Sequence, residues 1–228
     1  GQSYTISGTT YKVVDDSTIT AEISAGNYNL VTTKVTSMSS MFNGNTSFNT
    51  DISFWDTSSV SNTYRMFRGA SSFNKNIGAW DVSKVTNMDQ MFVNASVFNN
   101  GGSSDINNWN TSNVTTFNSA FQNSAFNQNI GSWNVSSATI MSSVFYSNGD
   151  FNQDIGSWNV SSVTNMMSMF RNATSFNQDL SSWCVHSNFD SEPTTNGGFN
   201  GSANSTWTND AAKQPDWDAA DGTGQNCS

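Results

Sequence analysis

The stretch FNQDIGSWNVSSVTNMMSMFRNATS, residues 151–175, contains a pattern that recurs along most of the chain. Its landmarks are Phe-Asn, an apolar residue four positions after the Phe, then Trp, Val, Thr, Met, Phe and Ala. The Phe-Asn pairs begin at Phe48, Phe73, Phe98, Phe126, Phe151 and Phe176, so their steps are 25, 25, 28, 25 and 25 residues. A period of this length predicts a solenoid, in which each repeat buries its apolar side only against its neighbours.

The other landmarks keep the same period. Tryptophans recur at Trp55, Trp80, Trp109, Trp133, Trp158 and Trp183, and a second set of phenylalanines recurs at Phe42, Phe67, Phe92, Phe121, Phe145 and Phe170. Because the Trp has a fixed phase beside Ile and Phe, we predict that it lies in the core. The Asn after each first Phe also recurs, and we predict that this amide is buried and hydrogen-bonds the backbone of the next repeat.

Two short elements are predicted in each repeat. Phe and Ile at even spacing favour a strand over segments such as Phe151–Ile155, and apolar residues at helical spacing favour a helical turn over Val163–Ala173. The expected fold class is an α/β solenoid of about six 25-residue repeats, with short parallel strands and short helical turns, over residues 34–183.

Both ends of the chain leave the period and are predicted to be caps. In residues 1–33, the segment Tyr4–Asp15 alternates around Ser7-Gly8, which predicts a hairpin. Residues 184–228 form the C-terminal cap and contain both cysteines, Cys184 and Cys227. We favour a disulfide between them, and two free thiols are the alternative. A disulfide would indicate an oxidising compartment outside the cytoplasm.

The third repeat contains extra residues, Asn100–Ser104, before the register resumes at Trp109. We expect this insertion to loop outward. Protruding loops on repeat arrays often bind partners, so it is a secondary binding candidate.

Composition limits the function classes. The net charge is −9, charged residues are 11% and aromatic residues are 13% of the 228 residues. Regularly placed aromatics exclude a disordered chain. The negative charge argues against nucleic acid and against an anionic membrane surface, and no run approaches the length of a membrane span.

The phrases SVTNMMSMFRNATSFNQDL and FNQDIGSWNVSSVTNM resemble the BspA-like leucine-rich-repeat surface proteins, also described as Mycoplasma lipoprotein-type 25-residue repeats. The opening residues and the tail from LSSWCV resemble caps of that family. The resemblance implies a right-handed, leucine-rich-repeat-like coil, a secreted or cell-surface location, and adhesion to host or matrix molecules. The chain departs from ordinary leucine-rich repeats because Leu30 and Leu180 are its only leucines.

The positions that vary between repeats are the candidate binding residues. Arg65, Arg68 and Arg171, with Tyr64 and Tyr146, all occur in the segment predicted to be a helical turn. Arg and Tyr are frequent contact residues at interfaces. We predict that they bind an extracellular protein or glycan, and ordinary solvated surface is the alternative.

The remaining functional expectations are largely negative. His186 is the only histidine, and no periodic nucleophile or carboxylate accompanies it. We therefore expect that the protein is not an enzyme and that it has no catalytic residues, metal or cofactor. The alternative to an adhesion module is a structural subunit whose repeats stack head to tail between chains to form an extracellular filament, sheath or phage-like fibre.

Overall fold

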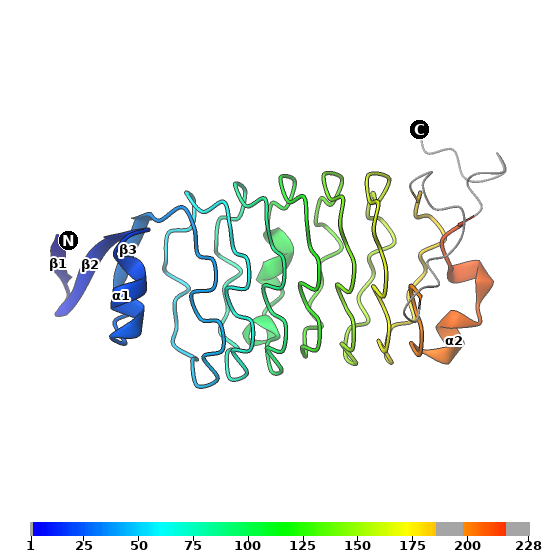
Figure 1. Cartoon of the computed structure of the whole chain (residues 1–228), viewed down its shortest axis with the longest axis horizontal. Coiled ribbons are helices and arrows are strands. Elements are labelled where there is room, and N and C mark those ends of the chain that lie inside the picture. Colours follow the sequence, from blue (N-terminus) through cyan, green and yellow to red (C-terminus); the bar gives the residue numbers. More distant parts are fainter. Residues whose placement is uncertain (1, 186–197, 218–228) are drawn as a thin grey trace.

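The computed structural model describes residues 2–185 and 198–217, and its centre is a long row of stacked chain coils with a small cap at each end (Figure 1). We number the coils by their ranges, 35–59, 60–84, 85–113, 114–137, 138–162 and 163–185. A column denotes the equivalent positions of successive coils. Isolated parallel bridges join each coil to the next, at Ser37↔Asn62, Asn62↔Asn87, Asn87↔Thr116, Thr116↔Ile140 and Ile140↔Asn165.

The N-terminal cap is a three-stranded sheet with one helix. Strands β1 (Ser3–Ile6) and β2 (Thr9–Asp15) form the expected antiparallel hairpin, and β3 (Leu30–Lys34) pairs parallel with β2. The turn works because Ser7 and Gly8 both have positive φ, 48° and 82°. Helix α1 (Ile19–Ser24) buries Ile19 and Ile23 and leads the chain from β2 to β3.

The predicted strand over Phe151–Ile155 is wrong, because these residues have no strand conformation. At this point of the coil an amide side chain, rather than a backbone carbonyl, accepts the bond from the next coil. Asn152 N–H, for example, donates to Asn127 Oδ1 at 3.0 Å. The backbone-to-backbone bridges lie in the column of Asn165 instead.

The predicted helical turn is also wrong, because segments such as 163–173 form consecutive turns without a helix. Ser168 and Asn172 have φ of 57° and 60°, and the equivalent positions of the other coils also have positive φ. This backbone directs alternate N–H groups toward the next coil. In the first coil, the N–H groups of residues 38, 40, 42 and 44 donate to the carbonyls of residues 62, 64, 66 and 68.

The Asn column forms a ladder along the stack. The side-chain oxygens of Asn49, Asn74, Asn99, Asn127 and Asn152 each accept the backbone N–H of the Asn one coil further on, at 2.8–3.0 Å. The predicted hydrogen bond is therefore confirmed. The predicted burial is wrong, because these Asn residues are exposed or half-buried at the surface of the stack.

Aromatic rings fill the interior. Within a coil, two phenylalanine rings stack, as in Phe145 and Phe151, whose centroids are 3.8 Å apart. Across coils, rings of one column also stack, as in Phe145 and Phe170 at 5.6 Å. The repeat tryptophans are buried, as predicted, and each indole Nε1 donates to a carbonyl of the preceding coil or the N-terminal cap at 2.9–3.3 Å.

The insertion packs against the stack instead of looping outward. It forms two 3-10 helices, η1 (Asn100–Gly102) and η2 (Ser104–Asn108). Asn100 is fully buried, and its Oδ1 accepts the N–H of Ile77 at 2.8 Å. The extra residues therefore accept a hydrogen bond from a backbone N–H group of the neighbouring coil. The predicted outward loop is wrong for this reason.

The described part of the C-terminal cap continues the stack and then covers it. The N–H groups of Ser168 and Phe170 donate to the carbonyls of Gly198 and Phe199, both at 2.9 Å. Helix α2 (Ser205–Thr208) places the buried Trp207 edge-on against Phe176, with centroids 4.7 Å apart. After the 3-10 helix η4 (Ala211–Lys213), the Asn ladder ends where Lys213 Nζ donates to Asn177 Oδ1 at 3.0 Å.

At the other end, Asp16 closes a hydroxyl column. In the interior coils, the N–H and hydroxyl of residues such as Ser61 both donate to the carbonyl one coil earlier. The first coil has no earlier coil, and Thr36 donates its N–H and its hydroxyl to the Asp16 carboxylate at 2.8 Å and 2.5 Å. Ser37 N–H donates to the same carboxylate. The hydrogen bond from the Thr36 side chain, chiefly, lowers the pKa of Asp16 below its ordinary value.

Asp16→Ala is expected to reduce the free energy of unfolding by about 1–2 kcal/mol at neutral pH, because three donors of the first coil lose their acceptor. The pKa of Asp16 is lower in the folded chain, so its stabilisation is present above the unfolded pKa and is lost as pH falls through the folded value. The difference between the wild type and the variant in urea unfolding should therefore be largest at neutral pH and should shrink as the pH falls below 3.8, the ordinary Asp value. Asp150→Ala, at an exposed carboxylate, is the control. A difference that persists undiminished in acid would contradict this role.

Candidate functional site

Two columns vary from coil to coil, and we call them, together with the column of Arg65 and Gln90 that lies between them, the variable face. The first contains Ser39, Tyr64, Asp89, Asn118, Ser142 and Met167, and the second contains Asn43, Arg68, Val93, Gln122, Tyr146 and Arg171. By contrast, the exposed hydroxyl column reads Thr36, Ser61, Thr86, Thr115, Thr139 and Thr164. Size, charge and polarity change only slightly in the hydroxyl column but strongly along the variable face.

The run of turns explains how these side chains are positioned. Between the two columns lies a column of positive φ, which includes Arg65 (55°) and Gln90 (56°). Non-glycine residues adopt this conformation only where the surroundings enforce it, and here the ladder to the next coil does so. The side chains of the variable face therefore leave a backbone that hydrogen bonds hold on both sides.

Two of the predicted binding residues, Tyr64 and Arg65, form the first cluster. The Arg65 guanidinium carbon lies 4.7 Å from the centroid of the Tyr64 ring, and Arg65 Nε donates to Gln90 Oε1 at 3.0 Å. The cation–π contact and the amide together fix the guanidinium. Its plane suits carboxylate, sulfate or phosphate groups, which it can bind through two parallel hydrogen bonds.

Arg68 lies in the same coil and is half-buried. Its Nε is buried and has no hydrogen-bond acceptor among the described residues. A buried donor without a partner is uncommon in folded proteins. Arg68 is therefore the member of the predicted set whose hydrogen bonding is incomplete in the part of the chain that the structure describes.

Two more of the predicted binding residues, Tyr146 and Arg171, form the second cluster. They occupy the same column in consecutive coils, and the Arg171 guanidinium carbon lies 5.6 Å from the Tyr146 ring centroid. The column places Arg68 three coils before Tyr146, so about 14 Å separates the two clusters at about 4.8 Å per coil. The structure thus puts all five predicted residues on one face but in two groups.

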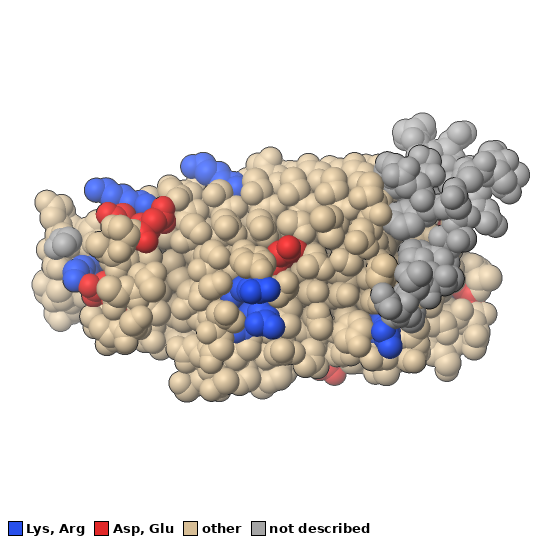
Figure 2. Space-filling view, in the orientation of Figure 1, with Lys and Arg blue, Asp and Glu red and all other residues tan. Residues whose placement is uncertain are grey.

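Few charges surround these groups. Figure 2 shows that most of the visible face carries neither Lys, Arg, Asp nor Glu, and that basic side chains gather near its middle. Asp89 is the carboxylate of the variable face, and its Oδ1 accepts the Thr116 hydroxyl at 2.7 Å. Asp56 and Asp81 belong to another column, where the Ser58 and Ser83 hydroxyls, chiefly, lower the pKa of each carboxyl.

Other sequence predictions have different outcomes. Cys184 is in a disulfide, and its predicted partner Cys227 lies outside the described residues, as does His186. Among residues 2–185 and 198–217, no cluster of His, Cys, Asp or Glu could hold a metal ion. No helix in the same ranges has the length and apolarity needed to cross a membrane.

Sequence reasoning missed two features. Gln90 and Asp89 lie beside the Tyr64–Arg65 cluster, and their place in the 25-residue register could have identified them. A cavity of about 450 Å³ between the N-terminal cap and the first coil was also missed. It depends on how α1 packs beside β2, for which the non-repeating sequence offers no signal.

The chain matches one family model twice. The model is described as "Mycoplasma protein of unknown function, DUF285", and the matches cover residues 11–104 and 100–207. They span all six coils. No curated protein and no solved structure matches the chain.

Proposed function

We propose that the chain, which belongs to the DUF285 family, is a secreted or cell-surface module that binds an extracellular protein or glycan through its variable face. Within this proposal, the stacked coils are a leucine-rich-repeat-like solenoid of the BspA-like type, and the module acts in adhesion. It is not an enzyme and uses no cofactor.

The proposal rests on the positions at which the residue type differs from coil to coil. Interior columns repeat Phe, Ile and Trp, and the hydroxyl column repeats Thr or Ser. The variable face instead combines tyrosine, arginine and amide side chains on a backbone fixed by the coil-to-coil bonds. Packing does not keep the residue type constant on this face. The face includes Arg–Tyr pairs that are already ordered, and such pairs are suited to contact with a partner.

Two further features support an extracellular location. Cys184 is in a disulfide, and such bonds persist in oxidising compartments. The surface is also poor in charge, with 11% charged residues in the chain. Contact through hydrogen bonds, stacking and a few arginines fits neutral or sparsely acidic glycans and protein surfaces better than nucleic acid.

Arg65→Ala, Arg68→Ala and Arg171→Ala are each expected to weaken binding by about tenfold, the effect of losing roughly 1.4 kcal/mol at a contact residue. A glycan and matrix-protein array with the wild type would identify the ligand, and surface plasmon resonance would then compare the variants. Lys84→Ala removes an exposed cation outside the variable face and is the matched control. Equal affinities of the wild type and all three arginine variants would reject this site.

One observation favours self-assembly as the second candidate function. Strand β1 lies at the edge of its sheet and is exposed along its whole length, with 52% of Tyr4 and 63% of Ile6 accessible. Exposed edge strands can pair with another chain. Assembly would appear as polymers in light scattering, and substitutions on the variable face would leave those polymers intact.

A further inference from the structure

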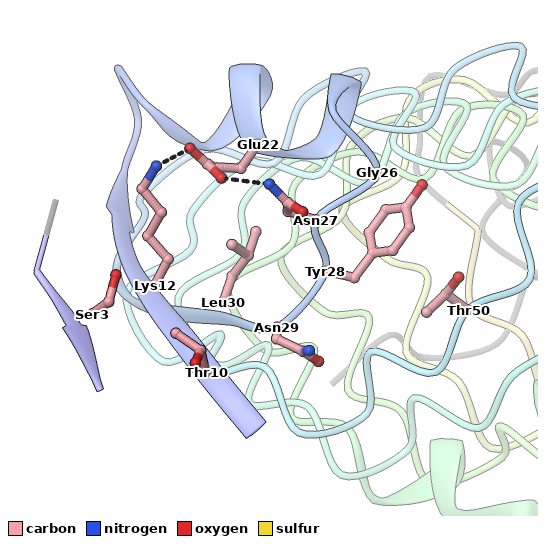
Figure 3. A pocket seen from close by; sticks show the side chains of 10 residues that line it. All are labelled: Ser3, Thr10, Lys12, Glu22, Gly26, Asn27, Tyr28, Asn29, Leu30 and Thr50. Atoms are coloured by element: carbon pink, nitrogen blue, oxygen red, sulfur yellow. Dashed lines mark hydrogen bonds and ion pairs between the residues drawn. The ribbon is translucent and has the colours of Figure 1, made fainter. Parts of the chain in front are cut away.

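The cavity at the N-terminal cap is a second place where a ligand could bind. It has a volume of about 450 Å³ and lies among β1, β2, α1 and the first coil (Figure 3). Small-molecule sites in proteins usually have volumes of about 300–1,000 Å³. None of the residues that line it belongs to the variable face, so its function is separable from the one proposed above.

One wall of the cavity is polar but has no net charge. The Lys12 ammonium pairs with the Glu22 carboxylate, and the other Glu22 oxygen accepts Asn27 Nδ2 at 3.0 Å. Among the residues that the structure describes, Lys12 and Glu22 are the charged members of the lining. The hydrogen bond from Lys12, chiefly, lowers the pKa of Glu22, which keeps the carboxylate ionised at neutral pH. Because each charge is already paired, the wall favours neither a free anion nor a free cation.

The opposite wall offers an aromatic ring that is held in place. The half-buried Tyr28 ring packs against Phe48 and Phe42, with centroids 5.3 Å and 6.2 Å away. The Tyr28 carbonyl also accepts Trp55 Nε1 from the coil stack. Figure 3 shows Tyr28 and Thr50 on one side of the space and the Lys12–Glu22–Asn27 group on the other. The floor between them includes Leu30, which is buried.

We propose that this cavity binds one neutral sugar ring, such as the terminal residue of a glycan. A pyranose has an apolar C–H face, which suits the Tyr28 ring and Leu30, and a rim of hydroxyls. Those hydroxyls can bond to the amides of Asn27 and Asn29, the Thr50 hydroxyl and the paired Lys12 and Glu22 groups. A wholly apolar ligand would displace water from the Asn29 amide and the Thr50 hydroxyl without replacing its hydrogen bonds, which is unfavourable.

The test uses the ¹⁵N-labelled chain and four methyl glycosides, of glucose, galactose, mannose and N-acetylglucosamine. Each is titrated to about 20 mM, a concentration that detects binding with a Kd near 1 mM, which corresponds to about −4 kcal/mol. At least one should shift the side-chain amide signals of Asn27 and Asn29 and the backbone signal of Tyr28. Signals that move only on the variable face, or no movement with all four glycosides, would overturn the proposal.

Two variants test the location. Thr50→Trp should fill the exposed mouth of the cavity, and Asn29→Ala should remove a hydrogen-bonding amide, each weakening sugar binding at least tenfold. Gln128→Trp introduces the same side chain at the position equivalent to Thr50, three coils away, and should bind as the wild type does. Unchanged affinity in Thr50→Trp would also overturn the proposal. The arginine variants of the variable face should keep this sugar binding, which separates the two sites.

Discussion

Phe145→Ala is expected to lower the free energy of unfolding by about 3–5 kcal/mol, the usual cost of truncating a buried phenylalanine. Phe145 is fully buried in the fifth coil. Its ring stacks on Phe151 at 3.8 Å, on Phe170 at 5.6 Å and on Phe121 at 6.0 Å. Truncation therefore leaves a cavity that faces three rings from three coils.

The position within the stack makes this loss more than local. Each coil contacts only its neighbours, so stability is shared through the interfaces between coils. A weakened fifth coil divides the stack into an N-terminal part of four coils and a short C-terminal part attached to the cap. Chemical denaturation followed by circular dichroism should show a lower midpoint, and tryptophan fluorescence should report a broader transition than in the wild type.

Phe54→Ala is the matched control for that experiment. Phe54 belongs to the first coil and is 48% exposed, with an edge-on contact to Tyr11 at 6.0 Å. Removing an exposed ring should cost less than about 1 kcal/mol. If the two alanine variants unfolded at the same denaturant concentration, the stacked rings would not be the source of stability that the packing indicates.

Gly78→Ala is expected to cost about 3 kcal/mol, at the upper end of what overpacking usually costs. A Cβ at Gly78 would lie 2.7 Å from the carbonyl carbon of Asp105 and 2.8 Å from the Ile106 nitrogen. Both are backbone atoms of η2 in the next coil, so they cannot rotate away. The extra methyl must separate two coils or displace the packed insertion.

Gly149→Ala provides the comparison. The nearest atom to a Cβ at Gly149 is Thr174 Oγ1 at 3.4 Å, which is ordinary van der Waals contact with a side chain. We expect a change within about 0.5 kcal/mol in either direction. Thermal unfolding of the two variants would measure the difference. A Gly78→Ala variant as stable as the wild type would show that η2 does not pack on the second coil as described.

Much of the core could be predicted from sequence because periodicity reports side-chain environment directly. Phe145 and Trp158 recur at fixed intervals, and both are buried. Backbone conformation was harder to predict. Val163, Met166, Phe170 and Ala173 have helical spacing, yet Ser168 and Asn172 between them have positive φ. The spacing of apolar residues indicates which side chains face the core. Two different backbone conformations can direct the same side chains toward the core.

The ladders explain the remaining errors. Serine and asparagine in left-handed conformation are strained in isolation, and the coil-to-coil hydrogen bonds that compensate for it are not visible in a single repeat. The insertion was misjudged for the same reason, since Asn100 binds the backbone of Ile77 in a different coil. For the candidate site, sequence identified the five Arg and Tyr residues. Their division into two groups follows from the register of the coils.

Asp16 and Lys213 end their ladders with side chains, whereas every coil between them offers its neighbours nearly the same donors and acceptors. An in-frame duplication, such as a second copy of residues 114–137, would therefore add one coil without altering either terminus. It would also move the Tyr146–Arg171 pair about 4.8 Å further from the Tyr64–Arg65 pair. The number of coils therefore determines the distance between the two contact points. Duplication of a repeat in the gene can change that distance in steps of one coil.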